Sequence, residues 1–186
     1  MTVNIALLRG INVGGKNIIK MAELKKAFET LGFKEVKTYI QSGNVLFKSD
    51  ETEQALQYII EHEIEAVFGL SVNVVLRTSE ELEQIILNYP FPKDEVVKAE
   101  LSTDAVAQYV ALLRNNSDSE KLQLLDAYAG ENDQYRAIGR EIYLLFHHSI
   151  RDSNLANNLN KLDVPATVRN WKTISKLAEM AKSMEN

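Results

Sequence analysis

The chain has 186 residues, of which 45% are hydrophobic and 25% are charged, a balance typical of a globular protein with one large or two small domains. It has no cysteine, which excludes disulfides and thiolate metal sites and fits a reducing cytoplasm. Residues 1–10 lack the basic segment and the long apolar run of a signal peptide or membrane span. We therefore expect a cytoplasmic protein that does not enter a membrane.

The net charge of −5 argues mildly against a nucleic-acid-binding protein, but charge is unevenly distributed along the chain. Residues 1–48 carry a net charge of +5, residues 49–133 carry −13, and residues 134–186 carry +3. If both ends of the chain lie together, they form a positive surface that attracts anions. The alternative is that these charges belong to ordinary solvated helix faces.

Residues 1–77 show the pattern of a ferredoxin-like unit. Apolar residues recur at strand or helix spacing, and Ser42-Gly43 separates two β-branched and aromatic runs, as in a hairpin. The expected elements are a strand at 3–8, a helix at 21–31, a hairpin at 36–47, a helix at 56–68 and a strand at 72–76. The order β-α-β-β-α-β predicts an antiparallel sheet with both helices on one face.

The second half repeats this plan after a helical linker at 78–104, in which Thr78 and Glu81 form a capping-box pattern. The expected elements of the second unit, 105–186, are a strand at 107–114, a helix at 117–128 with a Ser117/Glu120 capping box, a hairpin turning at Gly139-Arg140, and helical segments at 153–162 and from Trp171. "IALLRGIN" near the N-terminus is echoed by "VALLRNN" at 110–116. The fold class is therefore α+β with two ferredoxin-like units, and we expect an internal duplication.

The segment "LLRGINVGGKN", 7–17, has the glycine and lysine spacing of a nucleotide-binding P-loop. Three features argue against that function. Asn17 replaces the hydroxyl residue that binds Mg²⁺, the helical pattern starts near Met21 rather than at Lys16, and no apolar strand ends in a suitably placed aspartate. ATP or GTP hydrolysis is therefore disfavoured.

Strand order instead places this segment beside the hairpin turn, because in a ferredoxin-like sheet the end of the first strand, the start of the first helix and the turn between the second and third strands share one edge. The resulting loops offer backbone N–H groups, cations and neutral polar side chains, which suit phosphate or carboxylate. The candidate ligand residues here are Arg9, Asn12, Lys16, Ser42 and Asn44, with Lys20 as a further cation. The alternative is that the glycines and asparagines only allow the chain to turn.

A second candidate segment is "ATVRNWKTISKLAEMA", 166–181, whose apolar residues recur at helical spacing. Asn170 is placed as an N-cap, and Arg169 and Lys172 flank Trp171 at the helix start, where an anion is favoured. Trp171 fits a core position as well. Arg169, Asn170, Trp171 and Lys172 complete the candidate ligand residues, and the sequence leaves open whether they meet the 9–17 loop.

The sequence gives little support for a hydrolytic active site or a metal site. No G-x-S-x-G or H-E-x-x-H motif is present, and His147 and His148 are adjacent strand residues that point to opposite faces and so do not share a metal. We therefore name no catalytic residue, metal or cofactor, and leave open whether the protein is an enzyme.

The segments "LLRGINVGGKNIIKMAELKKAFETLGFKEVKTYIQSGNVLF" and "ATVRNWKTISKLAEMA" resemble the N- and C-terminal signatures of the bacterial domain-of-unknown-function family 1697. The resemblance implies two ferredoxin-like units in a cytoplasmic protein, and it implies no activity. The chain departs from the family after "REIYL", where "LFHHSIRDSN" replaces a turn that tends to contain proline and glycine.

Three functions remain open. The leading hypothesis is binding of a small anionic or phosphate-bearing ligand at the edge formed by the 9–17 loop and the 41–44 turn. A structural or protein-interaction role is the second, through exposed sheet edges. Nucleic-acid binding is the third and is disfavoured, because the first strand has no aromatic residue and the third has only Phe47 on which bases could stack. The sequence does not give the oligomeric state.

Overall fold

The computed structural model describes residues 1–185 and divides them into two compact units, each with one four-stranded antiparallel sheet. Unit 1 comprises residues 1–84 together with the chain from Ser175 onward, and unit 2 comprises residues 85–174. The α+β class with two ferredoxin-like units is confirmed. Within the described residues, no helix combines the length and apolar character needed to cross a bilayer.

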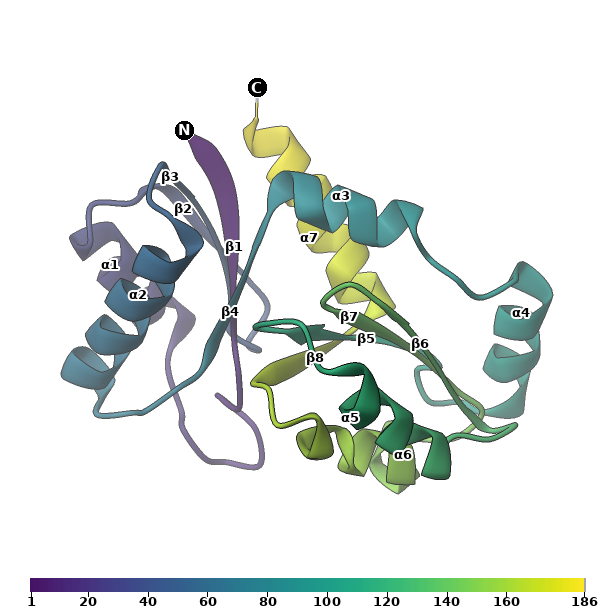
Figure 1. Ribbon diagram of the computed structural model, residues 1–186. Coiled ribbons are helices and arrows are strands. Elements are labelled where there is room, and N and C mark those ends of the chain that lie inside the picture. The colour runs from purple at the N-terminus through teal and green to yellow at the C-terminus, as the bar shows by residue number, and fades with distance from the viewer. Residues whose placement is uncertain (186) are drawn as a thin grey trace. The chain divides into compact units, whose positions relative to one another are not determined.

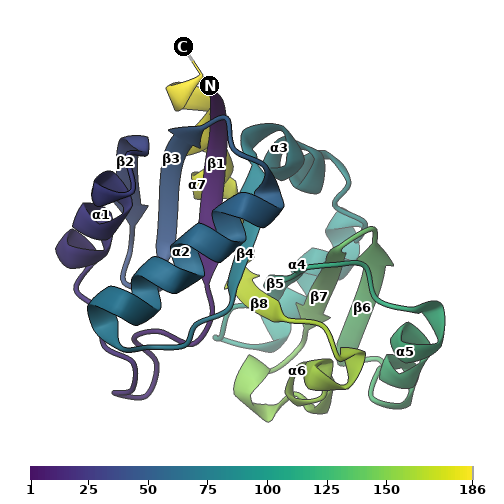
Figure 2. The same cartoon turned by 60° about the vertical axis from the view of Figure 1, so that its left-hand side comes forward.

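Unit 1 follows the predicted β-α-β-β-α-β order. Its elements are β1 (Thr2–Leu8), α1 (Met21–Thr30), β2 (Lys34–Tyr39), β3 (Asn44–Ser49), α2 (Glu53–Phe68) and β4 (Val74–Thr78), followed by α3 (Ser79–Leu87). The sheet order is β2-β3-β1-β4, with every neighbouring pair antiparallel. Figures 1 and 2 show α1 and α2 side by side on one face of this sheet.

The core of unit 1 lies between that sheet face and the two helices. Phe28 of α1 and Phe47 of β3 are buried and meet edge to face, with ring centroids 5.4 Å apart. Phe33, which precedes β2, stacks on Phe47 at 4.5 Å. Each of these aromatic side chains removes a large apolar area from water, which stabilises the unit.

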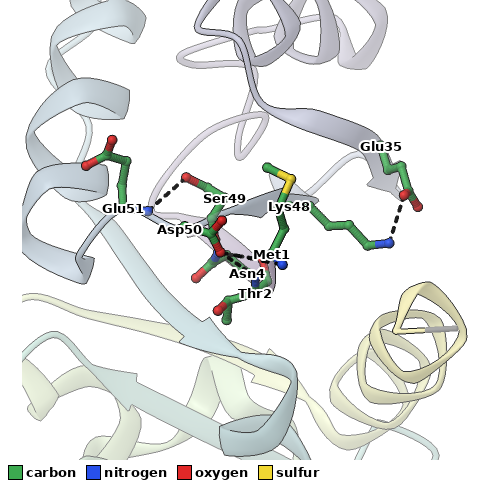
Figure 3. Close-up of polar contacts among 8 residues, drawn as sticks. All are labelled: Met1, Thr2, Asn4, Glu35, Lys48, Ser49, Asp50 and Glu51. Atoms are coloured by element: carbon green, nitrogen blue, oxygen red, sulfur yellow. Dashed lines mark hydrogen bonds and ion pairs between the residues drawn. The ribbon is translucent and has the colours of Figure 1, made fainter.

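Polar contacts close the end of the sheet where β1 begins and β3 ends (Figure 3). The Asn4 side-chain amide donates to the backbone oxygens of Thr2 and Ser49, at 3.1 and 3.3 Å, and the Thr2 N–H donates to Asp50 Oδ1 at 3.2 Å. Lys48 of β3 pairs with Glu35 of β2 at 2.7 Å. These contacts fix one end of the sheet, and the candidate site lies at the other.

The sheet of unit 2 has the order β6-β7-β5-β8, again with antiparallel pairs. The strands β5 to β8 thus take the places that β1 to β4 take in unit 1. After α4 (Lys93–Ser102) its elements are β5 (Gln108–Leu113), α5 (Ser119–Gln123), the 3₁₀ turn η1 (Leu124–Ala127), β6 (Asp133–Ile138), β7 (Glu141–Phe146), η2 (Ile150–Asp152), α6 (Asn154–Asn157), η3 (Leu159–Leu162), β8 (Ala166–Asn170) and α7 (Trp171–Met184), which continues into unit 1. Short helical turns thus replace the two long helices of unit 1.

The helix expected at 117–128 is shorter and begins differently. α5 spans only Ser119–Gln123 and follows Asp118, while the Ser117 hydroxyl is buried with no hydrogen-bond partner in the described chain, so the Ser117/Glu120 capping box is wrong. The Tyr135 hydroxyl of β6 lies 3.2 Å from the Leu122 carbonyl oxygen. This contact lies where α5 ends and the chain tightens to the 3₁₀ geometry of η1.

Two other predicted helix starts are confirmed. The Thr78 hydroxyl accepts from the Glu81 N–H at 3.2 Å, and the Glu81 carboxylate accepts from the Thr78 N–H at 2.8 Å, a complete capping box. Asn170 Oδ1 accepts from the Thr173 N–H at 2.8 Å and caps α7. In both units the fourth strand therefore passes directly into a capped helix.

Candidate functional site

The 9–17 segment forms a tight hairpin after β1. The Asn12 N–H donates to the Asn17 carbonyl and the Lys16 N–H donates to the Val13 carbonyl, both at 3.1 Å. Gly14 and Gly15 connect these pairs with φ angles of 59° and 73°. Two successive positive φ angles are characteristic of a type I′ turn, which glycine adopts without steric cost. The segment is therefore a small β-hairpin with an exposed tip.

The Asn12 side chain holds this hairpin against the neighbouring turn. Its Nδ2 donates to the Gln41 carbonyl at 2.7 Å and to the Ile19 carbonyl at 2.9 Å, while its Oδ1 accepts from the Ile19 N–H at 2.8 Å. The Leu8 N–H donates to the Gly43 carbonyl at 2.9 Å. The structure thus brings the 9–17 loop and the 41–44 turn together, as strand order predicts.

Ser42 and Asn44 form the second wall of the candidate site. Asn44 is fully buried, and its Nδ2 donates to the Tyr39 carbonyl at 3.0 Å and to Ser42 Oγ at 2.8 Å. Gly43 between them has a φ of 76°, and a Cβ built there would lie 2.7 Å from Ile11 Cδ1. The Asn12 and Asn44 amides therefore have internal partners, and their observed role is to fix the two loops.

The cations of the edge point into solvent. Arg9, Lys16 and Lys20 are exposed, and across residues 1–185 their side chains form no ion pair or hydrogen bond. No aspartate or glutamate occurs before Glu23, so the hairpin itself has no neutralising carboxylate. Positive charges without a local counterion attract anions over about a Debye length, roughly 10 Å at 0.1 M salt. This surface, which we term the basic hairpin, comprises Arg9, residues 12–17 and Lys20.

The basic hairpin is not a P-loop. Lys16 lies in the hairpin, whereas α1 begins at Met21, and the residue before the helix is Lys20 with no side-chain cap. In a P-loop the glycine-rich turn leads directly into the helix whose N-terminal N–H groups bind phosphate. Any anion bound here would therefore be held by side chains and the exposed turn, without the helix start that a P-loop lysine adjoins.

The second candidate segment lies in unit 2 at the junction of β8 and α7. Arg169 is buried, and its Nη1 donates to Thr167 Oγ1 at 2.6 Å and to the Val168 carbonyl at 3.0 Å. Burial lowers the pKa of Arg169 to about 10. Asn170 caps the helix, as described above. Of the four candidate residues here, Lys172 alone is exposed.

Trp171 belongs to an aromatic cluster of unit 2. Its ring lies 4.4 Å from that of Tyr89 and 6.5 Å from that of Tyr143. The Tyr143 hydroxyl donates to the Ile85 carbonyl at 2.9 Å, and burial raises the pKa of Tyr143 to about 12. Trp171 is half-buried, and its ring packs against these tyrosines at the first turn of α7.

The histidines of β7's end make separate contacts. His147 Nδ1 lies 3.3 Å from Ser102 Oγ, while His148 Nε2 lies 2.9 Å from Asp133 Oδ2. Residues 1–185 contain no group of three or more His, Cys, Asp or Glu side chains arranged to hold a metal ion. Both histidines follow β7 instead of occupying the strand positions expected of them, and their ring nitrogens have different partners.

Sequence reasoning missed the contacts around His148. Asp133 opens β6, and its carboxylate also accepts a short hydrogen bond from the Ser153 hydroxyl. The hydrogen bond between His148 and Asp133 raises the pKa of His148 above its ordinary value, and the charges of Asp133 and Asp152 add to this effect while burial opposes it. Nothing in the spacing of residues 133, 148 and 153 indicates this cluster, because it forms only when β6 pairs with β7.

Comparisons with known proteins agree with this architecture. A family model described as "Protein of unknown function (DUF1697)" matches residues 1–143. A solved structure, that of the conserved bacterial protein SP0830 from Streptococcus pneumoniae, is similar with a TM-score of 0.74 and 25% sequence identity, over 97% of this chain and 98% of that one. The curated proteins searched gave no match. The chain therefore belongs to the DUF1697 family of proteins of unknown function.

Proposed function

We propose that the basic hairpin of unit 1 binds a small anionic or phosphate-bearing ligand. The observation that supports this is the set of exposed cations, Arg9, Lys16 and Lys20, on a hairpin without a local carboxylate. Guanidinium and ammonium groups make the strongest hydrogen bonds to phosphate and carboxylate, because donor and acceptor are both charged. All residues of the proposed site lie in unit 1.

Rigidity also supports the proposal. Asn12 holds the hairpin to the 41–44 turn with three hydrogen bonds of 2.7–2.9 Å, and Asn44 holds that turn to β2. A preorganised loop loses less conformational entropy on binding than a flexible one, so more of the interaction free energy appears as affinity. In this proposal Arg9 and Lys16 contact the ligand, while Asn12, Ser42 and Asn44 position the loops.

Thermal unfolding in the presence of anions tests this function. Inorganic phosphate, pyrophosphate and ATP at constant ionic strength should stabilise the protein by RT ln(1 + [L]/Kd), about 2.7 kcal/mol at a hundredfold excess over Kd. For a chain of this size that corresponds to a rise in Tm of roughly 5–10 °C. The Lys16→Ala variant should lose most of the rise, because it removes a cation from the hairpin tip.

Lys26→Ala is the matched control, because Lys26 is an exposed lysine of α1 and the substitution changes the net charge equally. Lys26→Ala should keep the anion-dependent rise in Tm. If none of the three anions shifts Tm, or if both variants lose the shift equally, the basic hairpin is not the binding site.

A protein-interaction role is the second candidate, and one observation favours it. Val13 and Ile18 expose 66% and 71% of their surface on or beside the hairpin, and Ile40 exposes 49% beside Gln41. Exposed aliphatic side chains that gather on one loop are typical of a contact surface. Substituting Val13 and Ile18 by serine would weaken such an interaction and leave anion-dependent stabilisation unchanged, which separates the two functions.

Nucleic-acid binding has less support. Phe47, the one aromatic residue of β1 and β3, is fully buried between Phe28 and Phe33. Base stacking needs an exposed aromatic ring on the sheet surface, and these two strands of unit 1 offer none. Fluorescence anisotropy with single-stranded RNA at low salt should therefore show no saturable binding.

We also propose that the two units arose by internal duplication. Besides the common strand order, Arg77 lies opposite Ile5 in the β1–β4 ladder and Arg169 lies opposite Val110 in the β5–β8 ladder. Ile5 and Val110 directly precede the two "ALLR" segments at 6–9 and 111–114. Sequence profiles built separately from the two halves of many relatives should align along these ladders, and profiles that align in another register would contradict the duplication.

A further inference from the structure

The His148 ring makes two polar contacts that are both with acceptors. Nε2 lies 2.9 Å from Asp133 Oδ2, and Nδ1 lies 3.1 Å from the Ser149 carbonyl oxygen. A neutral imidazole carries one N–H, so it can donate to only one of these oxygens and directs a lone pair at the other. The imidazolium cation carries two N–H groups and satisfies both. Only the protonated ring can therefore donate to both oxygens at once.

Asp133 connects this ring to the start of α6. Its Oδ1 accepts a short hydrogen bond from the fully buried Ser153 hydroxyl, and Ser153 Oγ accepts from the Ala156 N–H at 3.0 Å as the N-cap of α6. The Asp133 carbonyl also accepts from the Gly130 N–H at 2.9 Å. One carboxylate thus joins the edge strand β6, the turn after β7 and a helix cap.

We propose that His148, Asp133 and Ser153 form a pH-sensitive clasp, which is closed while His148 is protonated and loosens when the ring loses its proton. Deprotonation removes one of the two His148 hydrogen bonds and the charge that balances Asp133. The remaining Asp133 carboxylate then keeps Ser153 as its partner but loses its cation. The first turn of α6 and the start of β6 are the parts of unit 2 that this change releases.

The charged groups around the ring favour the cation. Asp133 of β6 faces Nε2, and Asp152 of η2 adds a second negative charge, while Phe146 packs against the ring with centroids 6.2 Å apart. Burial raises the pKa of Tyr109 in β5, and the positive charge of Arg151 in η2 partly opposes this rise. Because the pKa of His148 is raised in the folded state, the clasp stabilises unit 2 fully below the unfolded-state pKa of about 6.5. This contribution is lost as pH rises through the folded-state value.

The clasp also borders a surface groove along β6, to which Asp133 contributes together with Asp126, Glu131 and Tyr135. The Tyr135 hydroxyl lies 2.5 Å from Asp126 Oδ1, a contact that does not involve His148 or Ser153. Loosening of the clasp therefore frees a carboxylate that lines this groove.

NMR of the full chain labelled with ¹⁵N tests the proposal directly. At pH 6 both ring nitrogens of His148 should show the chemical shifts of a protonated imidazolium, and its titration midpoint should lie above the ordinary histidine value of about 6.5. A His148 midpoint at or below about 6.5, or a neutral tautomer at pH 6, overturns the proposal.

Hydrogen exchange tests whether deprotonation of His148 loosens the first turn of α6 and the start of β6. Protection factors of the Ala156 and Gly130 amides, corrected for the intrinsic pH dependence of exchange, should fall about tenfold as His148 deprotonates, which corresponds to roughly 1.4 kcal/mol. The Asp133→Asn variant should show low protection at every pH, and His147→Gln should behave as the unaltered protein. Protection that is independent of pH overturns the proposal, and it does so without any variant having to fold.

Discussion

At the scale of single residues, the candidate site depends on positions that only a few side chains can occupy. Asn12 and Asn17 adopt φ angles of 53° and 51°, a region in which asparagine is tolerated better than most residues. Asn12 also places its amide against Gln41 and Ile19. The polar residues at this edge thus serve loop geometry first, and the exposed cations remain for a ligand.

Gly43 is the most restrictive of these positions. Gly43→Ala should destabilise the protein by about 2–4 kcal/mol, because a left-handed alanine costs roughly 1–2 kcal/mol and its Cβ would lie 2.7 Å from Ile11 Cδ1. Gly10→Ala is the control, since Gly10 has a similar φ of 71° but no atom within 4 Å of the added Cβ. Urea unfolding of both variants measures the difference. Equal losses would show that contact with Ile11 does not matter.

At the scale of elements, each unit sends its fourth strand straight into a helix. Thr78 ends β4 and caps α3, and Asn170 ends β8 and caps α7. The cap satisfies a backbone N–H that would otherwise lack a partner in the first helical turn. The strand therefore fixes the position of the helix start, and Trp171 anchors that start in the aromatic cluster of unit 2.

Removal of the Asn170 cap should weaken α7. Asn170→Ala is expected to lower the free energy of unfolding by about 1 kcal/mol, within the 0.5–2 kcal/mol usual for an N-cap. Asn170→Asp keeps the acceptor for the Thr173 N–H and adds a charge that the helix dipole favours, so it should retain full stability. Thermal unfolding followed by circular dichroism measures both. Equal destabilisation by the two substitutions would contradict the capping role.

At the scale of the whole molecule, the chain does not divide into units at a single point. Unit 1 comprises residues 1–84 and is completed by the segment from Ser175 onward, whereas unit 2 is one continuous stretch. Leu177, Ala181 and Met184 of that returning segment are buried. The C-terminal half of α7 therefore contributes apolar burial to the unit that contains the basic hairpin.

A chain that ends after Ile174 should lose stability in unit 1. Loss of Leu177 and Met184 alone removes roughly 1.5–3 kcal/mol of burial each, a large part of a typical stability of about 5–15 kcal/mol. Amide exchange of β1 should accelerate strongly, and a chain ending after Met184 should retain the original protection. Unchanged protection of β1 in the shorter chain would show that the returning segment is not needed.

The sequence by itself determined the α+β class, the element order of unit 1 up to β4, the hairpins at Ser42-Gly43 and Gly139-Arg140, and the caps at Thr78 and Asn170, whereas it gave no sign of the strand β8. These features follow from periodicity and from interactions within a few residues, which a linear chain already contains. Strand order also sufficed to bring the 9–17 loop to the 41–44 turn. Only the tertiary structure decided the short α5, the buried environment of Arg169 and the His148–Asp133–Ser153 contacts. Each of these depends on groups distant in sequence that meet only when the sheet has formed.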